Sequence, residues 1–500
     1  MIRPGAQAPR YDPTAQRVSP PGASARPRRA ARHLDADVIV VGGGPAGAAT
    51  AIVLARAGVD VLVLDRATFP RTKPCGDCIS PGAEPVLRRL GAWSAALALG
   101  PARLSGWMLC SPRGRRVRLP FPGGARGLAV DRGPLDAALI ARAQMEGARF
   151  WADVHVVDVV RRGGRVTGVR VRAGRPRSAR APAGDHAAGA RGTACEGSRD
   201  AIRELRARFV VGADGLRSAV ASRLGVVRRA PRLRKVSFTM RVPVVRAGAA
   251  PGRGGSRHPW ATTNGSSGPR GHQVGELRLG HGAVLGLAPL SDHTAEGGVV
   301  HNVTLVLSAG RFGRPPASTR PAYVRRAVEA LAPDTRFDWT RASPPLASGA
   351  FDRPVRPVAG PGWALVGDAA GYYDPFTGQG IYQALRGGEL LGALLAETLA
   401  GGESAMGPWW RRWSVAHRRL TAGARRVQRL IELALGRPAR CEIALAILAR
   451  WPGLQRTLAG ITADLLPARA LLHPRASRAV PGTPIRAAAN GSRATPESMS

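Results

Sequence analysis

The stretch that decides the fold is Asp37-Val-Ile-Val-Val-Gly-Gly-Gly-Pro-Ala-Gly47. Its Val and Ile run predicts a short buried strand, and the spacing of residues 46–57 predicts a helix directly after the glycines. In a G-x-G-x-x-G turn the first glycine permits a tight turn, the second admits a diphosphate, and the third lets helix and strand pack closely. The unpaired N–H groups at the helix start would bind that diphosphate. The expected binding residues are Gly42, Gly44, Pro45, Ala46 and Gly47.

A second strand and an acidic residue complete this unit. Residues 61–64 are Val-Leu-Val-Leu, and Asp65 follows them. A carboxylate at this strand end is placed to accept hydrogen bonds from ribose hydroxyls. Asp65 therefore predicts an unphosphorylated ribose, as in FAD or NAD. Arg66 is either a residue that stacks on adenine or one more surface arginine.

Two later strand ends favour a flavin. Phe209–Ser218 reads as a strand ending in Gly-Ala-Asp-Gly, and Trp363–Gly371 as a strand ending in Gly-Asp. The carboxylate of Asp368, at the second strand end, can bond a hydroxyl of a polyol chain. The following helix opens with Gly378, Gly380 and Ile381. Its positive N-terminal end would approach the isoalloxazine ring and favour the reduced, anionic flavin. The sequence thus predicts FAD as the cofactor.

Together these segments resemble the flavoprotein group of aromatic hydroxylases, flavin-dependent halogenases and geranylgeranyl reductases, over roughly residues 36–400. The resemblance implies that Arg132 contacts the ribityl and diphosphate side of the flavin and that Val156 lies beside the adenine. It also implies that Asp214 belongs to a motif shared by flavin and pyridine-nucleotide contacts, and that Asp368 contacts the ribityl chain.

Within this group the sequence is most similar to the geranylgeranyl reductases. The matching segments are Lys73–Ser80 (Lys-Pro-Cys-Gly-Asp-Cys-Ile-Ser) and Gly367–Tyr382. The resemblance implies that Cys75 and Gly76 lie near the flavin. In this family an aromatic-rich strand ending in Phe-Pro lines the prenyl channel. The corresponding stretch here, Gly282–Pro289, keeps the proline but has no aromatic residue.

No residue identifies itself as catalytic, and Cys75 and Lys73 are the two candidates. Cys75 and Cys78 form a C-x-x-C pair, which elsewhere indicates a redox dithiol or half of a zinc site. No second pair and no thioredoxin-like unit accompany it, so we interpret Cys75 as a small residue beside the flavin. We expect no metal site. Lys73 is one of only two lysines, and is either a cation in the active-site cleft or an ordinary loop residue.

The predicted fold class is α/β: a discontinuous Rossmann-like FAD-binding domain, a sheet-rich substrate domain and a helical C-terminal extension. We expect FAD-binding parts at 35–230 and 346–400, a substrate-binding sheet lobe at 231–345, and the helical extension at 401–474. Residues 1–34 and 475–500 read as disordered tails. Residues 172–200 and 247–275 read as flexible insertions between strands.

The charge is +41, yet 72 of the 74 basic residues are arginines scattered through an Ala-, Gly- and Pro-rich chain. We interpret this as compositional bias and expect no nucleic-acid partner, because nucleic-acid-binding motifs are missing. Few, scattered cysteines and no apolar signal segment predict a cytoplasmic protein. Trp409, Trp410 and Trp413 either pack the C-terminal helices or touch the inner membrane face.

We therefore expect an FAD-dependent oxidoreductase, a geranylgeranyl-reductase-like enzyme acting on a lipophilic, isoprenoid-type molecule. One alternative is an NAD(P)H-dependent flavin monooxygenase, a hydroxylase of secondary metabolism. Another is an electron-transfer flavoprotein at the membrane surface. Because the sequence has no second G-x-G-x-x-G, NAD(P)H or a reduced electron carrier would bind only transiently as the donor.

Overall fold

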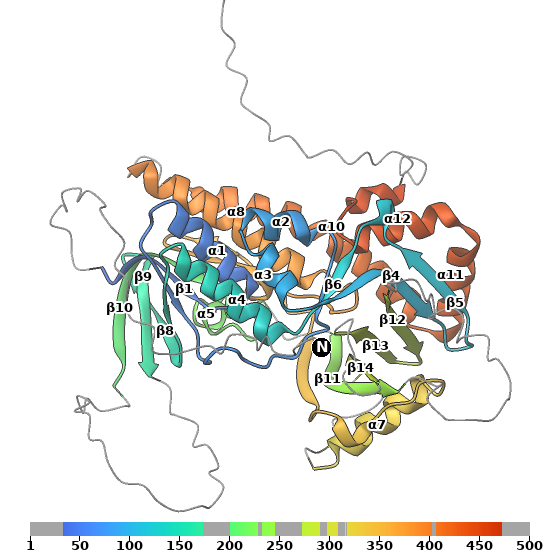
Figure 1. The fold of residues 1–500 in the computed structure, drawn as a ribbon. Coiled ribbons are helices and arrows are strands. Elements are labelled where there is room, and N and C mark those ends of the chain that lie inside the picture. Colours follow the sequence, from blue (N-terminus) through green and yellow to red (C-terminus); the bar gives the residue numbers. More distant parts are fainter. Residues whose placement is uncertain are drawn as a thin grey trace, which may run out of the picture.

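The computed structural model describes residues 34–173, 201–228, 233–245, 273–290, 298–308, 316, 318–402 and 407–472 (Figure 1). The tails expected at 1–34 and 475–500, apart from residue 34, lie outside the described residues. So do most of the two expected insertions. Their described ends, 172–173 and 273–275, extend strands β9 (Arg165–Ala173) and β12 (Gln273–Gly280).

The first sheet is the cofactor-side sheet, and its strand order is β16-β17-β10-β1-β2-β7, with β9 on β10 and β8 on β9. The strands are β1 (Ala36–Val41), β2 (Val61–Leu64), β7 (Arg149–Trp151), β8 (Val154–Arg162), β10 (Arg203–Gly212), β16 (Ala359–Gly360) and β17 (Trp363–Leu365). β10, β1, β2 and β7 run parallel. β2 is buried at every residue, as expected for a parallel strand covered on both faces.

Helices cover this sheet, as expected for a Rossmann-like α/β domain. They are α1 (Pro45–Arg56), α2 (Ala83–Arg89), α3 (Trp93–Ala98), α4 (Arg132–Met145), α5 (Ala219–Arg223) and α8 (Gly380–Ala400). α1 and α8 pack closely because α8 carries glycines at the contact. A Cβ on Gly388 would lie 2.4 Å from the carbonyl oxygen of Ala46, and one on Gly392 would lie 2.8 Å from the Cβ of Val53.

The second sheet has the order β15-β11-β14-β13-β12-β4-β6-β3, with β5 on β4. Its other strands are β3 (Cys78–Ile79), β4 (Ala102–Cys110), β5 (Arg116–Pro120), β6 (Gly127–Ala129), β11 (Leu233–Val245), β13 (Ala283–Pro289), β14 (Gly298–Ser308) and β15 (Leu346–Phe351). Strands β3 to β6 lie within 35–230 yet join this sheet, through the parallel pair β12–β4. The sheet therefore draws on both sides of the expected lobe boundary.

Among the described residues, one further helix and three 3-10 turns belong to the two lobes, and a fourth 3-10 turn, η4, lies in the C-terminal extension. They are α7 (Arg320–Leu331), η1 (Pro122–Gly124), η2 (Trp339–Arg341), η3 (Gly367–Ala370) and η4 (Ala468–Leu472). α7 buries Val324 and Val328 in a cluster with Phe238 of β11, which covers one face of the second sheet.

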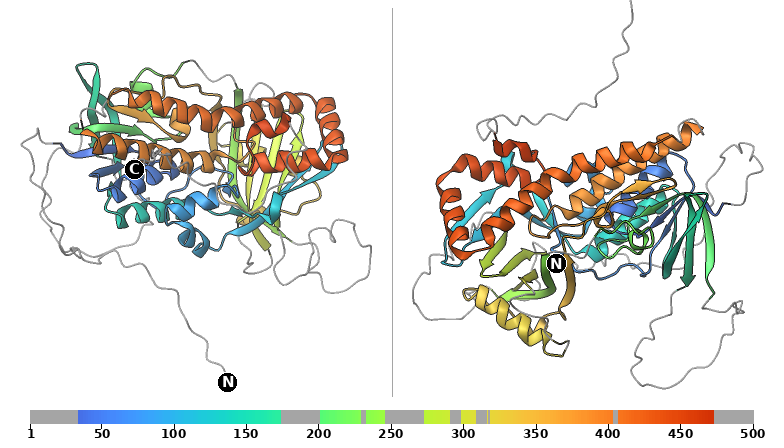
Figure 2. Two further views of the ribbon diagram at one scale, coloured as in Figure 1. Left: turned by 90° about the horizontal axis from the view of Figure 1, so that it is seen from above. Right: turned by 180° about the vertical axis from the view of Figure 1, so that it is seen from behind.

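The C-terminal extension consists of α10 (Trp409–Leu435), α11 (Pro438–Arg450) and α12 (Pro452–Thr462). Figure 2 shows α10 lying alongside α8 and leading into α11 and α12 beside the second sheet. Trp409 and Trp413 are 2% and 0% exposed, and the Trp413 indole donates to the Leu365 carbonyl oxygen (3.1 Å). These two tryptophans therefore pack against the first sheet. Among the described residues, no helix is long and apolar enough to cross a membrane.

Candidate cofactor site and adjoining cavity

The loop between β1 and α1 has the geometry of a diphosphate cradle. Gly42 has a φ of +107°, and a Cβ there would lie 2.4 Å from the Ala213 carbonyl oxygen of the β10 end. A Cβ on Gly47 would lie 1.9 Å from the Gly42 carbonyl oxygen. No side chain caps α1 at Gly44, and a Cβ there would meet only Arg71, so the first N–H groups of the helix remain available to an anion. Pro45 and Ala46 form the buried first turn.

Asp65 lies at the end of β2, as predicted, and is 8% exposed. Its carboxylate accepts hydrogen bonds from the backbone N–H of Gly43 (2.8 Å) and of Ala67 (2.9 Å). It thereby ties the glycine loop to the second strand. Arg66 is exposed. Val156 lies partly buried in β8, packed against the core of the first lobe. Contact of these residues with an adenosine half stays a prediction.

Arg71 is a candidate that the sequence analysis missed. Its Nη2 lies 3.8 Å from Asp65 and 3.3 Å from Asp136, and its guanidinium stacks over Phe69 at 4.8 Å. A Cβ on Gly44 would lie 3.5 Å from this same Nη2, so the cation faces the mouth of α1. Its Nε is buried and makes no hydrogen bond. A partly buried, incompletely bonded cation at this helix end fits a diphosphate.

Arg132 links α4 to the loop that carries Cys75. Its Nε and Nη2 donate to the two carboxylate oxygens of Asp136 (2.9 and 3.0 Å), and its Nη1 donates to the Cys75 sulfur (3.3 Å). Burial raises the pKa of the Cys75 thiol, although Arg132 opposes the shift. Cys75 is therefore a protonated thiol rather than a nucleophilic thiolate.

Lys73 and Asp368 lie near Arg132 and influence each other's pKa. Burial lowers the pKa of Lys73, and nearby Arg132 lowers it further, whereas Asp368 opposes the shift. Burial also raises the pKa of Asp368, opposed by Lys73 and Arg132. The Lys73 Nζ lies 3.3 Å from the point where a Cβ on Gly215 would stand. The structure thus brings Lys73, Cys75, Arg132 and Asp368 together.

Asp214 has a different role in the structure. Its carboxylate accepts hydrogen bonds from the Ser218 hydroxyl (2.6 Å) and from the backbone N–H groups of Ala219 (2.6 Å) and Val220 (3.3 Å). Asp214 therefore holds the start of α5 beside the β10 end. A contact of this carboxylate with a cofactor stays a prediction.

Gly76 and the glycines at the start of α8 leave room for a planar ring. Cβ atoms on Gly76 and on Gly380 would have no neighbour within 4 Å, so open space adjoins both residues. Gly378 has a φ of +69°, and a Cβ there would come only within 3.7 Å of Trp107. Ile381 is 5% exposed and belongs to the core. Taken with the diphosphate cradle, these residues fit FAD: a cation and helix N-terminus at one end, and an open apolar space at the other.

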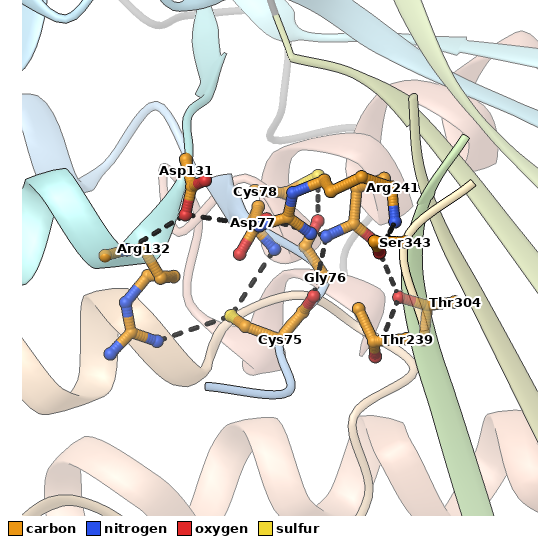
Figure 3. A network of polar contacts seen from close by, with 12 residues as sticks. Cys75, Gly76, Asp77, Cys78, Asp131, Arg132, Thr239, Arg241, Thr304 and Ser343 are labelled. Atoms are coloured by element: carbon orange, nitrogen blue, oxygen red, sulfur yellow. Dashed lines mark hydrogen bonds and ion pairs between the residues drawn. The ribbon is translucent and has the colours of Figure 1, made fainter. Parts of the chain in front are cut away.

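A polar network joins the Cys75 loop to the second sheet (Figure 3). The Asp77 carboxylate is 0% exposed, forms an ion pair with Arg241 of β11, and accepts from the Asn302 amide of β14 (2.7 Å). The same amide donates to the Cys75 carbonyl oxygen (2.8 Å). Burial raises the pKa of Asp77 to about 6, opposed by Arg241 and Asn302. The network fixes the loop between the two sheets.

An apolar cavity of about 260 Å³ adjoins this loop. Its lining joins Gly76 and Cys78 to the second sheet, to the loop before α8, and to the α10–α11 turn. Trp107 of β4 and Phe376 supply aromatic rings, although β13 has none. Both rings lie outside residues 282–289, the stretch in which the family resemblance places the aromatic residues, and so neither was predicted. Burial strongly raises the pKa of Cys78, so this thiol in the cavity wall stays protonated. Among the described residues, no cluster of three or more His, Cys, Asp or Glu could hold a metal ion.

A glycine cradle at a helix N-terminus, an acid after the second strand and an open space before α8 define a dinucleotide-binding flavoprotein geometry. Residues 35–406 match the family model described as "FAD binding domain". The chain belongs to this family, and it is an FAD-dependent oxidoreductase.

Named relatives are similar over most of the chain. A menaquinone reductase of Mycolicibacterium smegmatis is 32% identical over 371 residues, covering 72% of this chain and 76% of the relative. A digeranylgeranylglycerophospholipid reductase of Methanopyrus kandleri is 26% identical over 375 residues, covering 73% and 78%. These matches confirm the predicted likeness to the geranylgeranyl reductases.

Solved structures share the fold. A geranylgeranyl bacteriochlorophyll reductase-like protein from Thermoplasma acidophilum has a TM-score of 0.63 at 18% identity, covering 88% of this chain and 96% of that one. The flavin-dependent brominase Bmp2 has a TM-score of 0.64 at 16% identity, covering 89% and 97%. The predicted fold class is thereby confirmed.

Proposed function

We propose that this chain uses FAD to reduce a carbon–carbon double bond in the isoprenoid chain of a lipid. The observation that carries the proposal is the apolar cavity of about 260 Å³ that meets Gly76 and Gly378, where the reactive ring of the cofactor is expected. The relatives support the same reading, because their names include a menaquinone reductase and a digeranylgeranylglycerophospholipid reductase. Both named substrates carry isoprenoid chains.

Bound FAD would supply a hydride to one carbon of the double bond, and the other carbon would take up a proton, ultimately from solvent, to complete the gain of two hydrogen atoms. The protein's part is to hold the cofactor and exclude water. Arg71 and the α1 N-terminus would bind the diphosphate, and Lys73, Arg132 and Asp368 would surround the flavin end. Trp107, Phe376 and the leucines of β12 and β13 would bind the isoprenoid chain and keep its double bond dry.

The wall of the cavity also keeps its ionisable groups uncharged or paired. Cys78 stays protonated, and Lys235 forms ion pairs with Asp374 (2.8 Å) and with Glu432. A neutral chain can therefore enter without meeting an unpaired charge from these residues, which would be costly to desolvate. The electron donor, NAD(P)H or a reduced carrier, remains the prediction made from the sequence.

The test is anaerobic turnover by the purified, yellow protein after reduction with dithionite. It is offered either a prenylated naphthoquinone or a geranylgeranyl lipid, and the products are identified by mass spectrometry before and after exposure to air. We expect a gain of two hydrogen atoms that survives exposure to air, as for a saturated carbon–carbon bond.

Two other results would overturn the proposal. A gain that is lost in air, and that dithionite without the protein does not produce, would identify reduction of the quinone ring by the protein. Incorporation of one oxygen atom from O₂ with NADPH as donor would identify a hydroxylase.

A further inference from the structure

The outward side of the α10–α11 hairpin is unusually apolar. Leu430, Leu433, Ile443, Ile447 and Trp451 are 57%, 62%, 60%, 46% and 64% exposed, and we refer to these five residues as the hairpin ridge. Eleven large hydrophobic side chains are exposed among the described residues, so nearly half of them fall within this one stretch. Such clustering, unlike scattered exposed leucines, indicates a contact surface.

The ridge follows from helical spacing. Ile443 and Ile447 are four residues apart, so they lie on one face of α11, and Trp451 follows at the C-cap of the helix. The opposite side of α11 is buried through Cys441, Leu445 and Leu448, which pack against the second sheet. The helix therefore has two apolar sides, only one of which is covered by the described part of the chain.

The surroundings of the ridge are strongly basic. The exposed arginines between residues 426 and 451 are Arg426, Arg429, Arg437, Arg440 and Arg450. The hairpin has only two carboxylates between residues 426 and 451, and both are engaged. Glu432 pairs with Lys235, and Glu442 accepts from the backbone N–H of Arg113 (2.8 Å). Apolar side chains among unneutralised arginines complement a surface with acyl chains and anionic headgroups.

The ridge also adjoins the cavity. The turn between its two halves supplies Leu435, Gly436, Pro438 and Cys441 to the cavity wall. A molecule held against the ridge would therefore lie next to the wall of the space in which we place the isoprenoid chain.

We propose that the hairpin ridge and its arginines dock this protein on the surface of an anionic lipid bilayer, from which the isoprenoid substrate enters the cavity. The route of entry rests on the proposed function, whereas the docking itself does not. The leucines, isoleucines and Trp451 would lie at the boundary of headgroups and acyl chains, with the arginines at the phosphates.

The test is co-sedimentation of the full-length flavoprotein with vesicles of phosphatidylcholine alone or with phosphatidylglycerol added. We expect binding to the anionic vesicles that weakens at high salt. The Ile443→Glu/Ile447→Glu variant should bind at least tenfold more weakly. The Arg440→Ser/Arg450→Ser variant should lose about fivefold per arginine at low salt.

Matched controls come from the far lobe. Ile202→Glu changes an isoleucine that is 61% exposed, and Arg223→Ser changes an exposed arginine of α5; neither should alter binding. Turnover of a detergent-solubilised substrate should be the same in the ridge variants and wild type, because no ridge residue lines the cavity. When the substrate is supplied in vesicles, turnover by the ridge variants should fall in proportion to their loss of vesicle binding.

Several results would overturn the docking proposal. These are binding that ignores vesicle charge, ridge variants that bind like wild type, or a self-association of the protein that Ile443→Glu abolishes. If the protein binds vesicles through the ridge but reduces no isoprenoid, docking stands and the proposed function fails.

Discussion

Two loops flank the expected cofactor, and they are built in opposite ways. The Gly42–Gly47 loop is shaped by backbone contacts, with a Cβ on Gly47 only 1.9 Å from the Gly42 carbonyl oxygen. The Lys73–Ile79 loop is held by side chains that reach it from α4, β11 and β14. The first loop is therefore shaped mainly by close backbone approaches at its own glycines, whereas the second depends on side chains distant in the sequence.

The largest expected effect is on the backbone-built loop. Gly47→Ala places a methyl group against the Gly42 carbonyl oxygen, with no flexible side chain to yield. We expect a loss of about 3 kcal/mol or more in unfolding free energy, together with loss of bound FAD. The measurements are the ratio of flavin to protein absorbance and the denaturation midpoint.

Gly453→Ala is the matched control, since a Cβ there would have no neighbour within 4 Å and α12 would tolerate alanine. Full flavin retention by Gly47→Ala would show that the loop binds FAD without the close approach of residue 47 to the Gly42 carbonyl oxygen.

The second prediction breaks the side-chain-built loop. Arg241→Met removes the cation that pairs with buried Asp77 and with Asp131 (3.2 Å). We expect a loss of about 3 kcal/mol, because a buried carboxyl is left with Asn302 alone. The measurement is urea denaturation at pH 7.

Asp77→Asn in the same chain removes the charge and should restore part of the loss, giving a positive coupling in the double-mutant cycle. Additive effects of the two substitutions would contradict a direct Asp77–Arg241 interaction as the link between the sheets.

This contrast explains what the sequence could predict. β1, α1 and β2 lie within one residue of their predicted bounds, because glycine spacing and apolar runs are local signals. The helix predicted to open with Gly378, Gly380 and Ile381 is α8, which begins at Gly380. The second sheet joins β4 to β12 across about 170 residues, and no local pattern encodes that pairing.

The same limit applies to the candidate site. Gly42, Asp65 and Asp368 stand out because each follows a strand. Arg71 and Trp107 do not, since one is an arginine among 72 and the other lies in a strand that sequence analysis did not assign to the substrate lobe.

The third prediction separates the cavity from the cofactor cradle. Gly286 lines the cavity, and a Cβ there would make only ordinary contacts, the nearest at 3.7 Å from Leu277 and Thr304. Gly286→Leu should therefore fold and fill the cavity. We expect kcat/KM to fall about 30-fold, or ~2 kcal/mol, with unchanged flavin content. Gly286→Ala is the graded control, and unchanged kcat/KM in the leucine variant would place the substrate elsewhere.

The smallest effect concerns Asp464. This residue ties the C-terminal extension to Ser80, which follows β3, and to Gln379, which precedes α8. Its carboxylate accepts from Ser80 (2.6 Å) and from Gln379 (2.7 Å), and no hydrogen-bonded cation compensates its burial. Burial therefore raises its pKa from 3.8 to about 7. Between pH 4 and pH 7, Asp464 has therefore lost its proton in the unfolded chain but keeps it in the folded protein. The stability due to the protonated form is thus complete below pH 4 and is lost as pH rises through 7.

Asp464→Asn keeps both hydrogen-bond partners and suits the φ of +58°, but it cannot ionise. We expect the variant to gain roughly 1–2 kcal/mol over wild type between pH 5 and pH 8, measured by urea denaturation at each pH. Asp153→Asn, at a φ of +56° in the β7–β8 turn, controls for the substitution itself. A pH-independent difference would mean that Asp464 is ionised throughout, and that the extension is held to the loops by a charge rather than by a shared proton.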